Sequence, residues 1–277
     1  MIEMKLKDKI LLRVLPLIVI NVFVLVPIFW AIITAFKKEG DVLKIPIEYL
    51  PKPATLDNIK AAWAGGFSKY FINSINVSVI SVFFVVILSI MIGYALSRYK
   101  FKGKMLFMGM LLAIQFVPKA ALLIPLFETF NAVNLIGTHT ALVVVNIAFQ
   151  FPFNAVLMRG FIAGIPYSLE EAAMIDGCSR FQGVVKVVLP TLVPGIVTTA
   201  AFAFIGCWNE FLFSLMFLNS PAKYTVPIGL KMLQGEFNVN YSGVAAGALI
   251  AMSVPVLLFS YLQKYLVTGM SAGAVKG

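Results

Sequence analysis

The sequence predicts an all-α integral membrane protein with six transmembrane helices and a cytoplasmic helix-turn-helix between the fourth and fifth of them. Three observations support this fold class. Of the 277 residues, 60% are hydrophobic and 12% are charged, and the mean hydropathy of +0.94 lies outside the usual balance of a soluble domain. Six segments are apolar and long enough to cross a bilayer. Basic residues cluster in particular loops between these segments.

Each predicted span is a run of about 20 mostly apolar residues, the length that a helix needs to cross the hydrocarbon region. Helices are expected because unsatisfied backbone groups are not tolerated there. The first run follows basic residues, as a signal peptide would, but it is about twice as long as the usual apolar region and has no small-residue cleavage pattern. We therefore interpret it as a retained span. The six segments are 14–36, 71–97, 105–127, 140–158, 192–218 and 243–263.

The loop at 98–104 sets the predicted orientation. It contains four basic residues and no acidic one, so it should be cytoplasmic. Counting alternate connections then places the N-terminus, the stretch 159–190 and the C-terminus on the same side. The opposite loop, 37–70, also has lysines but dilutes them with acidic residues. The chain divides into an N-terminal part at 1–70 with the first span and an extracellular loop, a membrane core at 71–264, and a cytoplasmic tail at 265–277.

Composition and motifs argue against several function classes. The net charge of +10 is explained by basic cytoplasmic loops that face anionic lipid headgroups, so no nucleic-acid partner is expected. No GxxxxGK[ST] sequence is present, so the phosphate-binding loop of an ATPase is missing. A membrane-embedded enzyme would show clustered His, Asp or Glu residues, and the predicted spans lack such clusters. A non-catalytic role without a cofactor or metal in this chain is expected.

The connection between the fourth and fifth spans reads as two short helices. In GIPYSLEEAAMIDGCSRFQGVVKVVLP, residues 164–190, Ser168 precedes Glu171 by three positions, a capping-box arrangement that predicts a helix from about Leu169. Gly177 offers the left-handed conformation that ends a helix. Ser179 and Gln182 repeat the capping pattern for a second helix. A helix-turn-helix is therefore predicted here.

The first short helix has features suited to protein docking. Ala172 and Ala173 keep its surface low, so another protein can approach closely, while Glu170, Glu171 and Asp176 can pair with basic groups. The alternative is an amphipathic connector resting on lipid. Acidic residues would then face anionic headgroups, which disfavours that alternative.

The same segment resembles the binding-protein-dependent ABC importer permeases. Their hallmark is EAA, three residues, Gly, nine residues, Ile, one residue, Leu-Pro, with Val187 here at the Ile position. The resemblance implies that the segment is the coupling helix that enters a cleft of a cytoplasmic ATPase. The predicted coupling residues are Glu170, Glu171, Ala172, Ala173, Asp176, Gly177, Leu189 and Pro190.

Further motifs resemble the maltose-type, MalG-like carbohydrate permeases over nearly the whole chain. They are YALSRYKFKGK at 94–104, LIPLF at 123–127, IPYSLEEAAMIDG at 165–177, WNEFLF at 208–213 and GAVKG at 273–277. The resemblance implies a bacterial or archaeal cytoplasmic membrane location. It also implies a second, MalF-like permease, two copies of a cytoplasmic ABC ATPase that uses ATP and Mg, and an extracellular sugar-binding protein.

Glu210 is the one acidic residue inside a predicted span. Such a group should face protein or a water-filled cavity, and a carboxylate beside an amide and an aromatic ring suits sugar hydroxyls and the apolar face of a pyranose. The alternative is an ion pair with Lys119 that only holds helices together. In the maltose system that the chain resembles, the main membrane sugar site belongs to the other permease. The pathway candidates are Trp208, Asn209, Glu210, Phe211 and Lys119.

The predicted extracellular stretch 219–241 contains turn formers and aromatic residues. The resemblance implies that a loop in this region lies near the sugar-binding protein, with Gly235, Phe237 and Tyr241 as contact candidates. A solvated hairpin with no role is the alternative.

Two other transport functions compete with sugar import. A secondary transporter would not need a docking helix-turn-helix and usually carries more charge in its spans. An ABC permease for another polar solute, such as glycerol phosphate, is closer. An anionic cargo should favour several cationic groups along the pathway, whereas the spans offer Lys119. We therefore favour a neutral sugar or oligosaccharide, without identifying which one.

Overall fold

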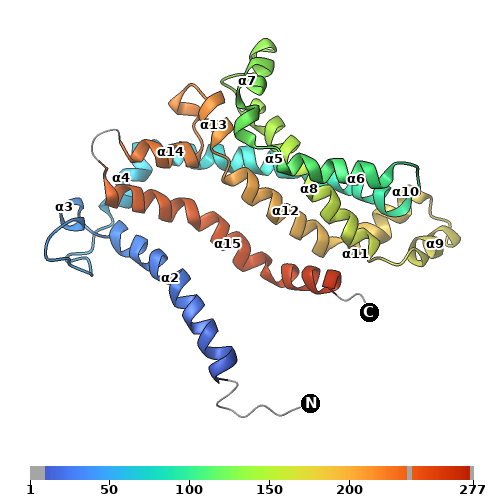
Figure 1. The fold of residues 1–277 in the computed structure, drawn as a ribbon, viewed down its shortest axis with the longest axis horizontal. Helices are drawn as coiled ribbons and strands as arrows, with labels where there is room; N and C mark the ends of the chain where they lie inside the picture. Colours follow the sequence, from blue (N-terminus) through green and yellow to red (C-terminus); the bar gives the residue numbers. More distant parts are fainter. Residues whose placement is uncertain (1–9, 236–238, 275–277) are drawn as a thin grey trace. The chain divides into compact units, whose positions relative to one another are not determined.

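The computed structural model describes residues 10–235 and 239–274, and every regular element among them is a helix (Figure 1). Contacts divide the chain into two units, each considered by itself. Unit 1 comprises Met1–Ser68 and Leu230–Ser253, and unit 2 comprises Lys69–Gly229 and Val254–Gly277. The predicted all-α fold is confirmed for the described residues.

Four helices in the described part are long and apolar enough to span a membrane: Leu15–Ala35, Asp57–Arg98, His139–Ala163 and Tyr241–Tyr265. Two further pairs qualify only when taken together. Lys104–Phe116 and Lys119–Ala132 meet at a bend of 91°, and Arg180–Thr191 and Val193–Trp208 meet at a bend of 73°. By length and composition, the described residues therefore contain four candidate spans, or up to six if each bent pair is one span.

Unit 1 contains α2 (Leu15–Ala35), whose C-terminal end packs against the start of α15 (Tyr241–Ala274). Ala35, Ala245 and Ala246 form its small buried core. The Asn58 side-chain amide closes the end of α2 by donating to the carbonyl of Ala35 at 2.8 Å and that of Lys37 at 2.7 Å. The remaining helices are η1 (Ile10–Val14), α3 (Glu39–Val42), α4 (Asp57–Ala62) and η2 (Trp63–Phe67).

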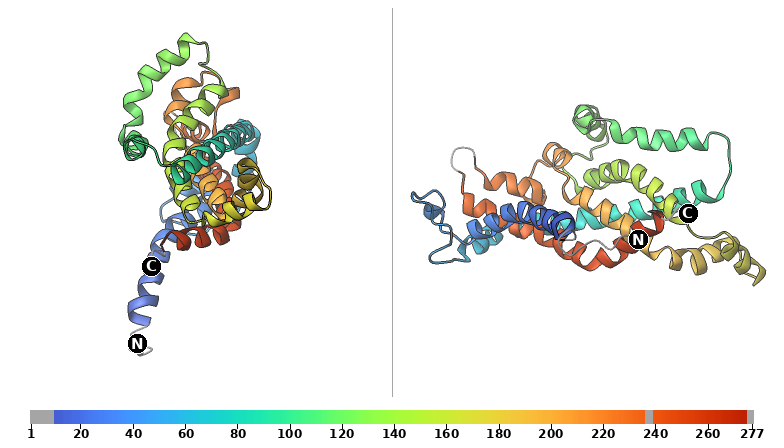
Figure 2. Two further views of the ribbon diagram at one scale, coloured as in Figure 1. Left: turned by 90° about the vertical axis from the view of Figure 1, so that its right-hand side faces the viewer. Right: turned by 60° about the horizontal axis from the view of Figure 1, so that its bottom comes forward.

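Unit 2 is built around α5 (Ser68–Arg98), α8 (His139–Ala163) and α12 (Val193–Trp208). Helix α12 lies along α8, and Gly195 permits this approach because a Cβ there would lie 2.7 Å from Cγ of Phe161. The short helices α9 and α10 lie at one end of this bundle, and α7 and α13 lie at the other (Figures 1 and 2). The other elements are α6 (Lys104–Ala113), η3 (Ile114–Phe116), η4 (Lys119–Leu122), α7 (Leu123–Ala132), α9 (Ser168–Ile175), α10 (Arg180–Gly183), η5 (Val184–Val188), α11 (Leu189–Thr191), α13 (Leu212–Phe217), η6 (Pro221–Lys223) and α14 (Val226–Leu233).

Two predicted spans are not continuous helices. The segment 105–127 breaks at Val117, which is extended with ψ of 120° because the following Pro118 disfavours helical backbone at the preceding residue. In the segment 192–218, α12 ends at Trp208, and a separate helix, α13, begins at Leu212. Apolar length alone did not reveal either break.

Candidate functional site

The predicted helix-turn-helix corresponds to α9 and α10, but its first cap differs from the prediction. Helix α9 begins at Ser168, so this residue lies inside the helix, and no side-chain cap is present. The carbonyl of Tyr167 instead accepts the backbone N–H groups of Glu170 at 2.9 Å and Glu171 at 3.1 Å. The predicted Ser168–Glu171 capping box is therefore wrong, because backbone bonds already close the first turn.

The turn between α9 and α10 agrees with the sequence prediction. Gly177 has φ of +87°, and its N–H donates to the carbonyl of Met174 at 3.1 Å. The capping box at the start of α10 is also confirmed. The Gln182 N–H donates to Ser179 Oγ at 3.3 Å, and the Ser179 N–H donates to Gln182 Oε1 at 2.8 Å.

Replacing Ser179 with alanine should loosen α10 without unfolding the chain. Loss of a side-chain cap costs about 1 kcal/mol, which should raise the hydrogen-exchange rate of the α10 amides about fivefold. Ser168→Ala is the matched control, since Ser168 makes no capping bond. Equal exchange in the two variants would contradict the capping geometry.

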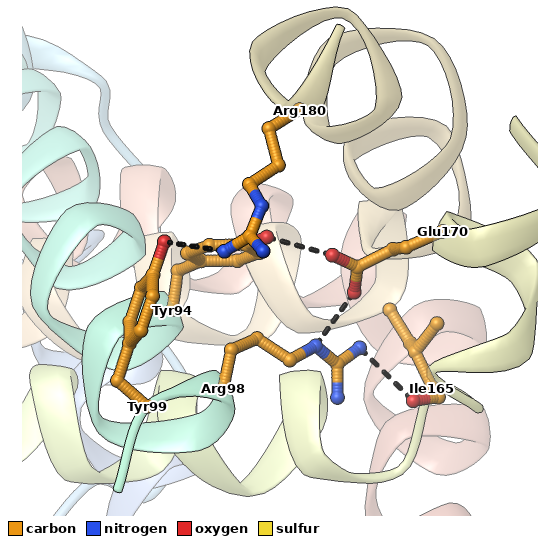
Figure 3. Close-up of polar contacts among 6 residues, drawn as sticks. All are labelled: Tyr94, Arg98, Tyr99, Ile165, Glu170 and Arg180. Atoms are coloured by element: carbon orange, nitrogen blue, oxygen red, sulfur yellow. Dashed lines mark hydrogen bonds and ion pairs between the residues drawn. The ribbon is translucent and has the colours of Figure 1, made fainter. Parts of the chain in front are cut away.

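Glu170 lies in a buried polar cluster between α9 and the end of α5 (Figure 3). Arg98 Nε pairs with Glu170 Oε1 at 2.6 Å, and the hydroxyl of Tyr94 donates to Oε2 at 2.6 Å. Arg98 Nη2 also donates to the carbonyl of Ile165 at 3.0 Å. The Arg98 and Glu170 side chains are only 9% and 6% exposed. The carboxylate of Glu170 is thus bound within the chain and does not contribute to an exposed docking surface.

The exposed surface of the two short helices, called the outer face below, carries the other predicted acidic residues, the basic Arg180 and apolar side chains. Glu171 and Ala172 are exposed on α9, and Asp176 and Gly177 are exposed in the turn that follows. Ala173 is buried instead, and a Cβ on Gly183 of α10 would lie 3.9 Å from its methyl group. Ala173 therefore allows α9 and α10 to pack closely and does not lower the outer surface.

Two prominent side chains of the outer face were not predicted from the sequence. Ile175 on α9 is 86% exposed, and Phe181 on α10 is 76% exposed. A signal was present, because both are large apolar residues within a polar segment. Their exposure depends on how α9 and α10 fold, which the local pattern does not give. The outer face therefore combines charged side chains of both signs with apolar contact area.

Leu189 and Pro190 lie away from this face, in α11 where the chain bends toward α12. Leu189 packs against the buried cluster that includes Val188 and Leu192. Pro190 stands in the first turn of α11, where the absence of its N–H costs no helical hydrogen bond. Both residues shape the connection between the short helices and α12.

Glu210 is buried at the start of α13. Its carboxylate accepts the N–H groups of Phe213 and Ser214, each at 2.8 Å, and the Ser214 hydroxyl at 2.7 Å. Lys119 Nζ lies 5.3 Å from the centre of the Phe149 ring. Among the described residues no ion pair joins Glu210 to Lys119, so that structural alternative is wrong.

The residues beside Glu210 differ in their accessibility. Trp208 is buried and stacks on Phe204 with ring centres 5.6 Å apart. Asn209 is exposed and Phe211 is half-buried. Within this chain, Asn209 and Phe211 therefore remain available for contact, whereas Trp208 packs in the interior.

Two of the predicted external contact residues lie in the described part. Gly235 has φ of +64°, consistent with a turn, and the exposed Tyr241 donates its N–H to Glu39 Oε1 at 3.0 Å at the start of α15. Phe237 lies outside the described residues.

Comparison with known proteins identifies the family. Residues 86–272 match the family described as binding-protein-dependent transport system inner membrane component. The chain is 34% identical to a sulfoquinovosyl glycerol transport system permease of Agrobacterium fabrum, over 91% of this chain and 89% of that protein. It is 33% identical to a diacetylchitobiose uptake system permease of Streptomyces coelicolor, over 94% and 95%.

Other relatives agree with this assignment. A trehalose transport system permease of Mycobacterium tuberculosis is 33% identical over 92% of this chain and 93% of that protein. The fold is similar to that of a bacterial ABC transporter involved in the import of the acidic polysaccharide alginate, with a TM-score of 0.80, 20% identity, and coverage of 96% of this chain and 100% of that chain. The chain belongs to the family of binding-protein-dependent transport system inner membrane components.

Proposed function

We propose that this chain is one of two permease subunits of an ATP-driven importer for a sugar or oligosaccharide. In this proposal it has six spans and cytoplasmic termini, and it shares the translocation pathway with a second permease. Two ABC ATPases supply the energy with ATP and Mg, and an extracellular binding protein delivers the cargo. The chain itself has no catalytic role.

The outer face of α9 and α10 is the observation that carries this proposal. Glu171 and Asp176 provide negative charge, and Ile175 and Phe181 provide exposed apolar area. Such a combination suits an apolar cleft with a basic rim on a partner protein. We assign this face to contact with the ATPase.

The relatives support a carbohydrate cargo. Their names include a glycoside of sulfoquinovose, diacetylchitobiose and trehalose. A neutral oligosaccharide remains our first candidate, because an anionic cargo would favour several cationic groups along the pathway. In the described spans Lys119 lies against an aromatic ring, and no cationic cluster accompanies it. Asn209 and Phe211 are the accessible candidates for contact along the pathway.

An anionic sugar is the second candidate. One relative transports sulfoquinovosyl glycerol according to its name, and the alginate importer with the similar fold takes an acidic polysaccharide. In that case Lys119 would supply positive charge at the pathway, and its contact with Phe149 would hold it there. Glycerol phosphate belongs to the same anionic class.

Affinity purification from native membranes tests the subunit composition and the cargo together. A tagged chain should recover a second permease and an ABC ATPase. With its binding protein, the reconstituted complex should take up at least one member of a panel comprising trehalose, diacetylchitobiose, sulfoquinovosyl glycerol and glycerol phosphate, in an ATP-dependent manner. Uptake without ATP by the chain alone would overturn the proposal in favour of a secondary transporter.

A further inference from the structure

The end of α5 is connected to both short helices by polar side chains (Figure 3). Arg98 and Tyr94 bind Glu170 on α9, as described above. Tyr99, directly after α5, accepts a hydrogen bond from Arg180 Nη1 on α10 at 3.4 Å. One span is therefore attached to the two helices that carry the outer face.

The Arg98–Glu170 pair differs from an ordinary surface ion pair. The Lys44–Glu48 pair has side chains that are 50% and 35% exposed, so water screens it and it constrains little. Arg98 and Glu170 are nearly excluded from water, and removing one partner leaves the other charge buried without compensation. Separation of α9 from α5 is correspondingly unfavourable.

The geometry also limits rotation of α9 against α5. The planar guanidinium of Arg98 binds Glu170 through Nε and the carbonyl of Ile165 through Nη2, so it holds both the helix and the segment that leads into it. Such a two-point contact resists rotation in a way that a lysine ammonium does not. Tyr94 binds the second carboxylate oxygen and limits rotation of the Glu170 side chain.

The fold of α9 does not itself require this cluster. Backbone hydrogen bonds close its first turn at Tyr167 and its last turn at Gly177, and Ala173 packs it toward α10. The two short helices therefore do not need the buried charges in order to form. The charges serve instead to attach α9 to α5.

We propose that Arg98, Tyr94 and Glu170 are positioning residues that lock α9 to α5, so that displacement of the outer face moves this span. Without the lock, the segment 164–167 between α8 and α9 would absorb the displacement. This inference rests on the proposed function, because it assumes that an ATPase moves α9. Beyond the proposed function, it names the side chains and the span through which a movement of α9 would reach the membrane-spanning helices.

The test compares Glu170→Gln and Arg98→Lys with wild type in the reconstituted complex of permeases, ATPase and binding protein. The first change keeps the size of the side chain nearly constant but removes its charge, and the second keeps the charge but removes the two-point contact. Glu128→Gln is the matched control, since Glu128 is exposed on α7. The readouts are the yield of assembled complex, the ATP hydrolysis rate, and the uptake per ATP hydrolysed of the panel sugar that wild type imports.

Both variants should assemble in lower yield than wild type, because each weakens a buried ion pair. The complex that does assemble should hydrolyse ATP, while its uptake per ATP falls about tenfold, within the range seen when coupling residues are altered. Glu128→Gln should match wild type. The charge reversal Arg98→Glu with Glu170→Arg should recover part of the uptake per ATP that either single reversal loses.

Two results would overturn the inference while leaving the proposed function intact. One is unchanged uptake per ATP in both variants. The other is a loss of assembled complex that accounts for the whole loss of uptake, which would mean that the cluster serves only folding. If wild type itself recovers no ATPase and shows no ATP-dependent uptake, the proposed function fails, and the inference fails with it.

Discussion

Glu210→Ala is expected to lower the stability of the folded chain by about 2–6 kcal/mol, because two buried N–H groups lose their acceptor at roughly 1–3 kcal/mol each. These are the N–H groups of Phe213 and Ser214 at the start of α13. Glu210→Gln should fall between alanine and wild type, since its amide keeps one acceptor oxygen. Thermal unfolding of the purified protein in detergent measures the effect.

Glu128→Ala provides the control for this stability loss, because Glu128 is an exposed glutamate on another helix of unit 2. It should unfold at the wild-type temperature. A Glu210→Ala protein that is as stable as wild type but imports poorly would instead point to the pathway role that the sequence also allowed.

Gly177→Asp should uncouple ATP hydrolysis from transport while leaving insertion into the membrane intact. The backbone at Gly177 has φ of +87°, where a side chain costs about 1–2 kcal/mol, although nothing lies within 4 Å of the added Cβ. The strain should displace the turn and thereby reorient α9 relative to α10. We expect uptake per ATP to fall about tenfold, an effect typical of altered coupling elements.

Gly103→Asp is a close control for the backbone strain. Gly103 has φ of +85° and also has open space around an added Cβ, but it precedes α6 and lies outside the turn between the two short helices. It should couple as wild type does. Normal uptake by Gly177→Asp would contradict the assignment of the α9–α10 face to the ATPase.

Capping and turn patterns predicted the ends of the short helices correctly where only neighbouring residues determine the hydrogen bonds. Gly177 and the Ser179–Gln182 box are of this kind, because the bonds run over three or four positions. Ser168 fits the same capping pattern but lies inside the helix, since the chain enters α9 one residue earlier than the pattern assumed. A cap pattern does not say where the preceding segment begins to turn.

Partners far apart in the sequence could not be predicted in the same way. Glu170 and Arg98 are 72 positions apart, and their pairing depends on how α9 folds back against α5. The sequence suggests other roles for both residues: Glu170 as a docking residue, and Arg98 as one of the basic residues that indicate orientation. Hydropathy likewise located the apolar segments but carried no information on the bends after Phe116 and Thr191.

The exposed Ile175 and Phe181 have a consequence for cells that make unequal amounts of the subunits. If the α9–α10 face lies in the cytoplasm, these side chains are in water until the ATPase covers them. Exposed apolar side chains are what chaperones and quality-control proteases recognise. A surplus permease would therefore be marked for removal by the same two residues that we assign to contact with the ATPase, and the subunit ratio would be corrected after synthesis.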